Sequence, residues 1–438
     1  MSQATAGPIA GRPAPRIVLS TFGSLGDLHP TLALAVGLKA RGFDAAVATS
    51  ATYRERVEAL GLGFRPVRPD HSEAAEIPEF MRRMMDLRTG PEQLIRHYFM
   101  PRVRDSFDDM MAASSGADLL VSHPITFATR LAAEVRGIPW ASCVLAPTGF
   151  FSIHDPPALA PAPFLSRFRP LGPRFYGPLF RWMRRSIWPW SDPWHRLRGE
   201  LGLAPAGDPL FEGQHAPGLV LAMFSRLLGG EQPDWPPQAR ITGFAFHDEA
   251  DSGLDPTLGA FLDDGPPPIV FTLGSAAVAV PGRFYEEAAE AARLLGRRAV
   301  LLVGQEAADR SIGTLPSDVI LVPYAPFALL FPRAAAIVHQ GGVGTTGQAM
   351  RSGRPMVVVP HAHDQPDNAE RVERLGIARV VPRHRFRAAR AAAELDRLLG
   401  APSYSVRAAE VGTTIRAEDG TAAACDALAA LVAAPIGR

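Results

Sequence analysis

The chain has 438 residues, of which 47% are hydrophobic and 20% are charged, and its formal net charge is +1. This balance excludes the strongly basic profile of a nucleic-acid-binding protein and the acidic profile of a disordered tail. The length is that of two or three domains of about 150 residues each.

No feature of the sequence indicates secretion or insertion into a membrane. Residues 1–16 lack the apolar stretch of a signal peptide. No apolar run of about 18 residues, the length that spans a membrane, occurs in the chain. The two cysteines, Cys143 and Cys425, are far apart and form no Cys-x-x-Cys pair. We therefore expect a soluble cytoplasmic protein.

The first half of the chain alternates short apolar runs with helical patterns. Ile17–Phe22 is a predicted strand, and a helix follows from Leu28 to Arg41 and ends at Gly42. Further predicted elements are the strands Ala45–Thr49, Leu119–Ser122, Ala141–Leu145 and Leu219–Ala222 and the helices Tyr53–Leu60 and Phe127–Arg136. This alternation predicts an α/β fold with a doubly wound parallel sheet.

The second half repeats this scheme after a proline-rich segment, Glu231–Gln238, that is typical of a linker. Its predicted strands are Ile269–Thr272, Ala299–Val303, Val319–Val322, Ala336–His339 and Met356–Val359. Two doubly wound domains that are joined by one linker predict a cleft between them, and ligands bind there at the carboxyl ends of the strands.

Two segments interrupt the alternation. Residues 77–113 are rich in Met, Arg and Phe, and residues 150–200 are rich in aromatic residues and Arg. Segments of this composition suit either an apolar pocket or contact with a membrane surface.

The strongest local motif is the glycine-rich turn Val338–Gln348, which lies between a predicted strand and a predicted helix. Its glycines let the backbone approach a ligand, and the helix that follows directs its positive dipole end at an anion. The hydroxyl groups of Thr345 and Thr346 can also donate to an anion. The turn therefore predicts a diphosphate-binding cradle.

The same turn leaves a second function open. Gly342, Gly344 and Gly347 fit the pattern Gly-x-Gly-x-x-Gly, and an acidic residue, Asp364, follows about twenty positions later, as in nicotinamide and flavin enzymes. A polar pair, His339-Gln340, stands before the glycines where such enzymes usually have a small or apolar strand end. We retain this alternative beside the diphosphate cradle.

Other polar residues follow predicted strands of the second half. The carboxylate of Asp364 and the amide of Gln365 can hydrogen-bond vicinal hydroxyl groups, which suits a sugar, and Asp364 can also cap a helix. Ser275 follows the first of these strands and can reach a phosphate. Tyr324 offers an aromatic face to a nucleobase and is equally compatible with a core position.

In the first half, the segment Gly23–Pro30 opens the first helix. Asp27 can serve as its N-cap, or as a general base that points into the cleft. His123 follows the predicted strand Leu119–Ser122 and is the best-placed imidazole to share a proton with Asp27. No His, Asp or Glu cluster has metal-ligand spacing, so we expect no metal cofactor.

Together these motifs resemble the nucleotide-sugar-dependent glycosyltransferases of the GT-B fold, in the family of the UDP- and dTDP-glycosyltransferases. The resemblance spans nearly the whole chain. The motifs that carry it are Gly23–Pro30, Gln232–Pro236, Thr242–Phe244, Phe271–Ser275, Val338–Gln348 and His363–Arg371. The last run looks most like the bacterial rhamnosyltransferases of the rhamnolipid type.

The resemblance implies a role for each matching residue. The diphosphate would be bound by Ser275, His339, Gly341, Gly342, Gly344 and Thr345. Many bacterial members have two consecutive histidines before the glycines, and here the second is Gln340, so either His339 or Gln340 is the main ligand. Tyr324 would stack on the base, and Gln348 stands where many members have a ribose-binding Glu. Asp364 and Gln365 would contact the sugar.

The resemblance also implies the mechanism and the division of the chain. Asp27, paired with His123, would deprotonate an acceptor hydroxyl, which attacks the anomeric carbon with inversion. Ser24, Phe150 and Phe151 would contact a lipophilic acceptor. The implied domains are an acceptor domain over residues 1–228, a donor domain over 229–415 and a terminal helix in 416–438 that packs back on the first domain.

The resemblance leaves several points open. dTDP-rhamnose and UDP-glucose both fit as the donor, and a hydroxy-fatty acid, a terpenoid or sterol, a polyketide and a flavonoid all fit as the acceptor. A nicotinamide or flavin enzyme and a non-catalytic auxiliary subunit remain alternatives. Segments 77–113 or 150–200 would make any peripheral contact with a membrane. The oligomeric state is not predicted.

Overall fold

The computed structural model describes residues 14–70, 77–248, 253–304 and 315–434, and most of the 1–16 segment lies outside them. Its first half forms a seven-stranded sheet in the order β3-β2-β1-β4-β5-β6-β7, and every pair of neighbours is parallel. The strands are β1 (Arg16–Ser20), β2 (Asp44–Thr49), β3 (Gly63–Pro66), β4 (Leu119–Ser122), β5 (Trp140–Val144), β6 (Val220–Ala222) and β7 (Ala239–Ile241).

The second half forms a six-stranded parallel sheet in the order β10-β9-β8-β11-β12-β13. Its strands are β8 (Ile269–Thr272), β9 (Ala299–Leu302), β10 (Val319–Val322), β11 (Ala336–His339), β12 (Met356–Val358) and β13 (Ala378–Val380). The two parallel sheets confirm the predicted fold class, two Rossmann-like domains.

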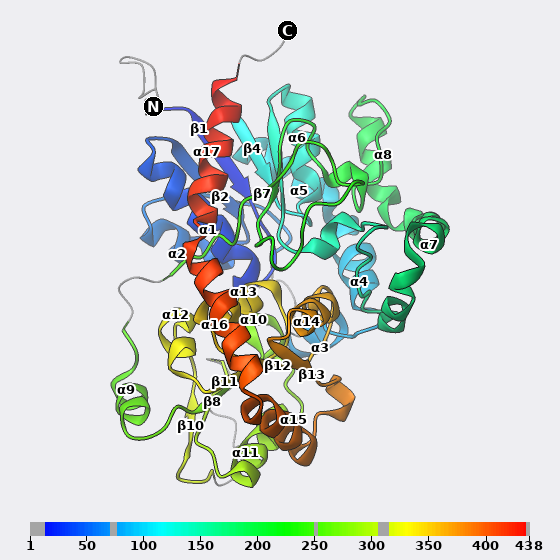
Figure 1. Ribbon diagram of the computed structural model, residues 1–438. Helices are drawn as coiled ribbons and strands as arrows, with labels where there is room; N and C mark the ends of the chain where they lie inside the picture. The colour runs from blue at the N-terminus through cyan, green and yellow to red at the C-terminus, as the bar shows by residue number, and fades with distance from the viewer. Residues whose placement is uncertain (1–13, 71–76, 249–252, 305–314, 435–438) are drawn as a thin grey trace, which may run out of the picture.

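Helices cover both faces of each sheet (Figure 1). In the first half they are α1 (Leu25–Ala40), α2 (Arg54–Ala59), α3 (Ile77–Met84), α4 (Gly90–Glu92), α5 (Val103–Ala113), α6 (Phe127–Arg136), α7 (Gly172–Ile187) and α8 (Asp192–Glu200). In the second half they are α9 (Pro256–Asp263), α10 (Gly274–Ala277), α11 (Phe284–Leu295), α12 (Phe327–Leu330), α13 (Val343–Ser352), α14 (Gln365–Arg374), α15 (Ala388–Gly400), α16 (Pro402–Ala417) and α17 (Gly420–Ala433).

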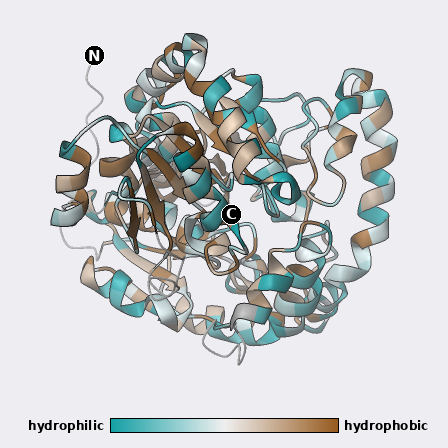
Figure 2. Cartoon of the chain, turned by 90° about the horizontal axis from the view of Figure 1, so that it is seen from below, coloured by the Kyte–Doolittle hydropathy of each residue, from teal (hydrophilic) through white to brown (hydrophobic). Residues whose placement is uncertain are grey.

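The central strands form the core of each domain. Every residue of β4, β5, β8, β9 and β11 is buried. Figure 2 shows hydrophobic strands inside the molecule and helices of mixed hydropathy around them. Strands that are buried on both faces need continuous apolar runs, which is why the sequence pattern located them.

The first sheet extends beyond the domain boundary predicted at residue 228. β7 pairs with β6 through Val220 and Ala239, so the proline-rich segment before β7 lies within the first domain. The last two helices bridge the domains: α16 packs on α13 of the second domain, and α17 packs on α1 of the first. At the second contact the Sγ of Cys425 lies 3.5 Å from the Leu34 carbonyl oxygen, and Arg41 pairs with Asp426 at 2.9 Å.

The aromatic segment 150–200 folds mainly into α7 and α8, which lie at the side of the first domain in Figure 1. In the part of the chain that the structure describes, no helix combines the length and the apolarity that crossing a membrane requires.

Candidate functional site

The two sheets turn their carboxyl ends toward each other. In the first sheet the strand order reverses at β1 and β4, and in the second it reverses at β8 and β11. Loops after such strands form the ligand crevice of open parallel sheets. The helices after β1 and β11 meet across this crevice: a Cβ added to Gly344 would lie 3.8 Å from the Cα of Gly26. The predicted catalytic and diphosphate motifs therefore share one cleft.

Asp27 lies in the first turn of α1, which begins three residues before the predicted start at Leu28. The N-cap is Ser24, not Asp27, and the two residues form a capping box. The Oδ2 atom of Asp27 accepts from the backbone N–H of Ser24 at 2.8 Å and from its hydroxyl at 3.3 Å. Ser24 is thus committed to the helix start, and the other oxygen of Asp27 stays available for chemistry.

His123 meets Asp27 as the sequence predicted. Its Nε2 atom lies 3.3 Å from Oδ1 of Asp27. Its Nδ1 atom faces the N–H of Ile125 at 3.5 Å, which favours the tautomer with the proton on Nε2. The His123 side chain is 6% exposed and that of Asp27 is 32% exposed, so an acceptor can reach the carboxylate but not the imidazole.

Two further residues near Asp27 were missed by sequence reasoning. The Tyr53 hydroxyl donates to the Gly23 carbonyl at 2.9 Å and fixes the turn before α1. Burial and the charge of Asp27 raise the Tyr53 pKa to about 12, so the phenol stays neutral. His363 has a φ of 55°, and burial lowers its pKa while the Asp27 charge opposes that shift. A non-glycine residue with a left-handed backbone is a signal of a functional site, but the sequence does not show the backbone conformation.

The glycine-rich turn forms a strand-to-helix cradle. Gly341 has a φ of 90°, and a Cβ there would lie 2.8 Å from Cγ1 of Val358. Gly342 is the N-cap of α13 and has no side chain to cap the helix. The first N–H groups of α13 therefore need partners from elsewhere, and that of Val343 hydrogen-bonds the Asp364 side chain. Thr345 and Thr346 are both buried, and the Thr346 hydroxyl has no hydrogen-bond partner among the residues that the structure describes. This geometry fits an anion at a helix N-terminus.

The structure separates the roles of His339 and Gln340. His339 is fully buried: its Nδ1 accepts from the N–H of Gly341 at 3.1 Å, and its Nε2 lies 3.3 Å from the Met356 sulfur. Burial lowers its pKa to about 3, so the ring is neutral. Both ring nitrogens of His339 thus face the protein, and the prediction that this side chain binds the diphosphate stays a prediction.

Gln340 takes the position that faces the cradle. A Cβ added to Gly274 would lie 2.2 Å from its Nε2 atom, and one added to Gly342 would lie 2.8 Å away. The amide therefore lies between the loop after β8 and the start of α13. Its Nε2 donates to the Thr345 hydroxyl at 3.4 Å, while its Oε1 is buried and has no partner in the described part of the chain. Of the two adjacent side chains, Gln340 is thus the one that lies beside the start of α13.

Asp364 occupies the N-cap position of α14, but its side chain does not cap the helix. It accepts from Asn368 at 2.7 Å, and the same Asn368 amide donates to the Gly341 carbonyl at 2.9 Å. Burial raises the pKa of Asp364 to about 7, with a smaller contribution from Asp27. Asn368, which sequence reasoning missed, thus links the predicted sugar carboxylate to the cradle.

Gln365 is only partly available to a sugar. Its Oε1 atom accepts from the backbone N–H groups of His361, at 2.8 Å, and of Ala362, at 3.0 Å. The oxygen therefore holds the loop that carries Asp364, and only the Nε2 atom remains for a hydroxyl. The prediction that Gln365 mainly binds the sugar needs this correction.

The other predicted donor residues lie around the cleft. Ser275 is exposed on α10, which packs near α1. Tyr324 is 39% exposed after β10, so it is not a core residue. Gln348 lies on α13, and its Nε2 is 3.5 Å from Asp248, which also pairs with Arg351. These predicted donor residues thus follow β8, β10 and β11 at one edge of the second sheet.

The predicted acceptor phenylalanines are used by the protein itself. Phe150 is buried and stacks on Trp235 with ring centroids 3.9 Å apart. Phe151 packs edge-on against Phe180 and Phe211. Phe150 therefore belongs to the core, because its ring is sandwiched between those of His215 and Trp235. Its contact with an acceptor stays a prediction.

Within the residues that the structure describes, no three His, Cys, Asp or Glu side chains gather in a group that could hold a metal ion. The cleft does provide other groups that suit a diphosphate. They are backbone N–H groups, the positive end of the α13 dipole, and side-chain hydroxyl and amide donors.

Two family models match this chain. The glycosyltransferase family 28 N-terminal domain matches residues 17–140, and the erythromycin biosynthesis protein CIII-like C-terminal domain matches residues 295–431. These matches fall on the two domains that meet at the cleft.

Characterised relatives match over nearly their full length. The chain is 36% identical to the O-mycaminosyltylonolide 6-deoxyallosyltransferase of Streptomyces fradiae, over 94% of this chain and 96% of that protein. It is 30% identical to the vancomycin aglycone glucosyltransferase of Amycolatopsis orientalis, over 93% of this chain and 96% of that protein.

Solved structures share the fold. The glycotransferase of kitacinnamycin superposes with a TM-score of 0.73 at 21% identity, over 96% of this chain and 99% of that one. The glycosyltransferase VinC, solved with dTDP, superposes with a TM-score of 0.64 at 22% identity, over 95% of this chain and 99% of that one.

Proposed function

Because this chain belongs to the GT-B glycosyltransferases with an erythromycin CIII-like C-terminal domain, we propose that it transfers a sugar from a nucleoside diphosphate to a hydroxyl group of a lipophilic natural product. This membership makes the chain a glycosyltransferase, and it favours that function over the alternative of a nicotinamide or flavin enzyme. The observation that carries the proposal is the contact of Asp27 with His123, opposite the α13 cradle.

In the proposed reaction Asp27 is the general base. Its Oδ1 atom takes the proton of the acceptor hydroxyl, and the oxygen attacks the anomeric carbon from the side opposite the diphosphate, which inverts that carbon. His123 orients the carboxylate and stabilises its charge before the transfer. The bond from the anomeric carbon to the diphosphate oxygen breaks, and the leaving diphosphate is stabilised by N–H groups of α13 and by Gln340 without a metal.

We propose a 6-deoxyhexose on thymidine diphosphate as the first donor to test. The relative at 36% identity is named for transfer of a 6-deoxyallosyl group. dTDP-rhamnose, itself a 6-deoxyhexose donor, and UDP-glucose remain in the comparison. The resemblance to the rhamnolipid-type enzymes stays a prediction.

We propose a polyketide as the acceptor class. This relative is named for the acceptor O-mycaminosyltylonolide, while others act, by name, on a vancomycin aglycone or on sterols. A large apolar acceptor needs room beside Asp27, and the segment from Met84 to Gly90 faces the cleft there, since a Cβ on Gly90 would lie 3.6 Å from the His363 ring.

Peripheral membrane contact remains a separate proposal, and the α7 region supports it. Residues 156–191 include six Arg and no Asp or Glu. Phe164, Leu171 and Trp182 are 58%, 56% and 66% exposed there. Such a surface should bind anionic vesicles in a salt-dependent way. Sedimentation with phosphatidylglycerol vesicles tests this, with neutral phosphatidylcholine vesicles as control, and equal binding to both or to neither would contradict it.

The test of the function is a panel of dTDP- and UDP-sugars with macrolide, sterol and hydroxy-fatty-acid acceptors. We expect release of a nucleoside diphosphate only when a suitable acceptor is present, and a glycosylated product detected by mass. Absence of nucleotide-sugar binding at millimolar concentration would overturn the cradle assignment. Binding without turnover for any acceptor would instead favour an auxiliary subunit.

A further inference from the structure

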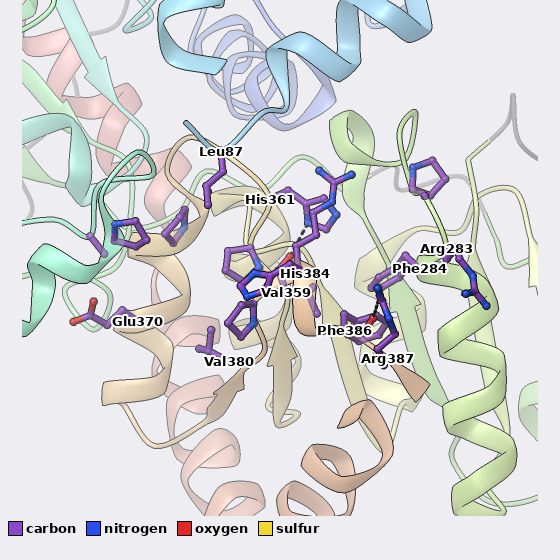
Figure 3. Close-up of a pocket in the computed structure, with 18 of the residues that line it drawn as sticks. Leu87, Arg283, Phe284, Val359, His361, Glu370, Val380, His384, Phe386 and Arg387 are labelled. Carbon is purple, nitrogen blue, oxygen red and sulfur yellow. Dashed lines mark hydrogen bonds between the residues drawn. The ribbon is translucent and has the colours of Figure 1, made fainter. Parts of the chain in front are cut away.

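A second cavity of about 740 Å³ lies beside the cleft (Figure 3). The first domain contributes Leu87, Ala158 and Pro163. The second domain contributes the start of α11, the loop after β12, one side of α14 and the turn Pro382–Arg387. Neither Asp27, nor His123, nor any cradle residue lines it, so it is distinct from the proposed active site.

The cavity shares one loop with the active site. Val359, Pro360 and His361 line it just before the loop that carries Asp364, and Pro366 lines it just after. Figure 3 shows Val359 and His361 at its centre. An occupant would therefore touch both flanks of the proposed sugar-binding loop and, through Leu87, the first domain as well.

The walls of the cavity are largely apolar. Phe284 and Phe386 stack with centroids 4.7 Å apart and rings inclined by 19°. Leu87, Val359 and Val380 add aliphatic surface. Pockets for small molecules have this character, with a few polar groups that fix the orientation of the ligand, and their volumes are about 300–1,000 Å³.

Most charges around the cavity are already paired. Arg283 and Arg387 lie 3.7 and 4.0 Å from the same Glu287, and Arg283 also pairs with Glu286 at 2.8 Å. On the opposite wall Glu370 pairs with Arg169. These groups leave little net charge to attract a ligand.

Arg383 and Glu373 are the exceptions, because within the described part of the chain neither has an ion-pair partner within 4.0 Å. Burial raises the pKa of Glu373, which disfavours its charged form. Arg383 donates to the Val280 carbonyl at 3.2 Å. Burial lowers its pKa, and only the more distant Asp86 opposes that shift. A partly desolvated guanidinium without a paired carboxylate favours an anion from outside the chain.

We infer that this cavity binds an apolar small molecule with a single carboxylate, which pairs with Arg383 while the apolar body lies against Phe284 and Phe386. A planar carboxylate matches the fork of a guanidinium. A phosphate dianion would need a second unpaired cation, whereas Arg283 and Arg387 are committed to Glu287.

The experiment is calorimetric titration of the full-length protein with dodecanoate, below its micelle concentration, and with dodecanol as the uncharged control. We expect dodecanoate to bind at one site, and Arg383→Gln to weaken it about tenfold or more, since hydrogen bonds to charged groups are the strong ones. Dodecanol should bind more weakly, and equally to both proteins. Arg385→Gln is the matched control, because Arg385 lies on the same turn but does not line the cavity.

A filling variant tests the location of the site. Val380→Trp should abolish binding of both probes while the thermal midpoint and thymidine diphosphate binding are retained, which shows that the protein is folded. Dodecanoate binding that is unaffected by Val380→Trp would place the site elsewhere and overturn the inference. So would equal effects of Arg383→Gln and Arg385→Gln, or equal affinities for dodecanoate and dodecanol.

Discussion

At the scale of single residues, adjacent side chains in the cradle have opposite roles. Gln340 faces the proposed diphosphate position, and its oxygen has no partner among the described residues, whereas His339 points into the core. Gln340→Ala should therefore raise the KM for the nucleotide sugar by about tenfold or more, the effect of one lost hydrogen bond to a charged group, with the thermal midpoint nearly unchanged. Steady-state kinetics and thermal unfolding check this. An unchanged KM would show that Gln340 does not contact the donor.

His339 should instead affect stability, in a pH-dependent way. Its pKa is lowered to about 3 by burial, so the unfolded chain binds a proton that the folded chain excludes. The stabilisation by the neutral ring is complete above pH 6.5 or so and is lost as the pH falls toward 3. Between pH 7.5 and pH 5 the wild type should lose about 2 kcal/mol of unfolding free energy through this group.

The variant His339→Asn isolates that effect, because the Asn oxygen can still accept from Gly341 but does not titrate. Its stability deficit relative to wild type should shrink by about 2 kcal/mol from pH 7.5 to pH 5. Urea unfolding at the two pH values measures this difference. A constant deficit would mean that the ring is not held neutral.

The sequence predicted these site residues more reliably than their orientations. The pairing of Asp27 with His123 was predictable, because the two residues follow β1 and β4, which are neighbours in the sheet. The turning of His339 and of the Gln365 oxygen toward the protein did not follow, because each depends on backbone N–H groups that only the folded loops present.

At the scale of elements, the sequence located the central strands and missed several at the edges. β4, β8, β10 and β11 were predicted to the residue, whereas β3, β7 and β13 were missed. These three lie at the ends of their sheets and are four, three and three residues long. An edge strand that is half-exposed needs no continuous apolar run, so its pattern resembles a loop.

The cradle turn predicts a contrast between two of its glycines. Gly341→Ala should destabilise the protein by about 1–3 kcal/mol and abolish donor binding, since its φ of 90° and the 2.8 Å approach to Val358 leave no room for a Cβ. Gly344→Ala is the matched control for stability, because its nearest neighbours lie at 3.8 Å. Urea unfolding compares the two variants, and thymidine diphosphate titration compares Gly341→Ala with the wild type. Equal losses of stability in the two variants would contradict the proposed geometry.

At the scale of the whole molecule, the fold places two strand-order reversals face to face. The first sheet provides Asp27 and His123, and the second provides the cradle and Asp364. The helix α17, which packs on α1, ties the end of the second half to the first domain. The base and the donor site thus lie on separate domains that are linked twice, by the segment after β7 and by α16–α17.

The measurement that tests this account most directly is acceptor-dependent release of nucleoside diphosphate by the wild type and by Asp27→Asn, in the presence of EDTA. Loss of a general base predicts a fall in kcat of about 10²–10⁴-fold, with donor affinity retained. Asp426→Asn, in an exposed ion pair on α17, should keep full activity. Activity that needs a divalent metal, or that survives in Asp27→Asn, would contradict the proposed mechanism.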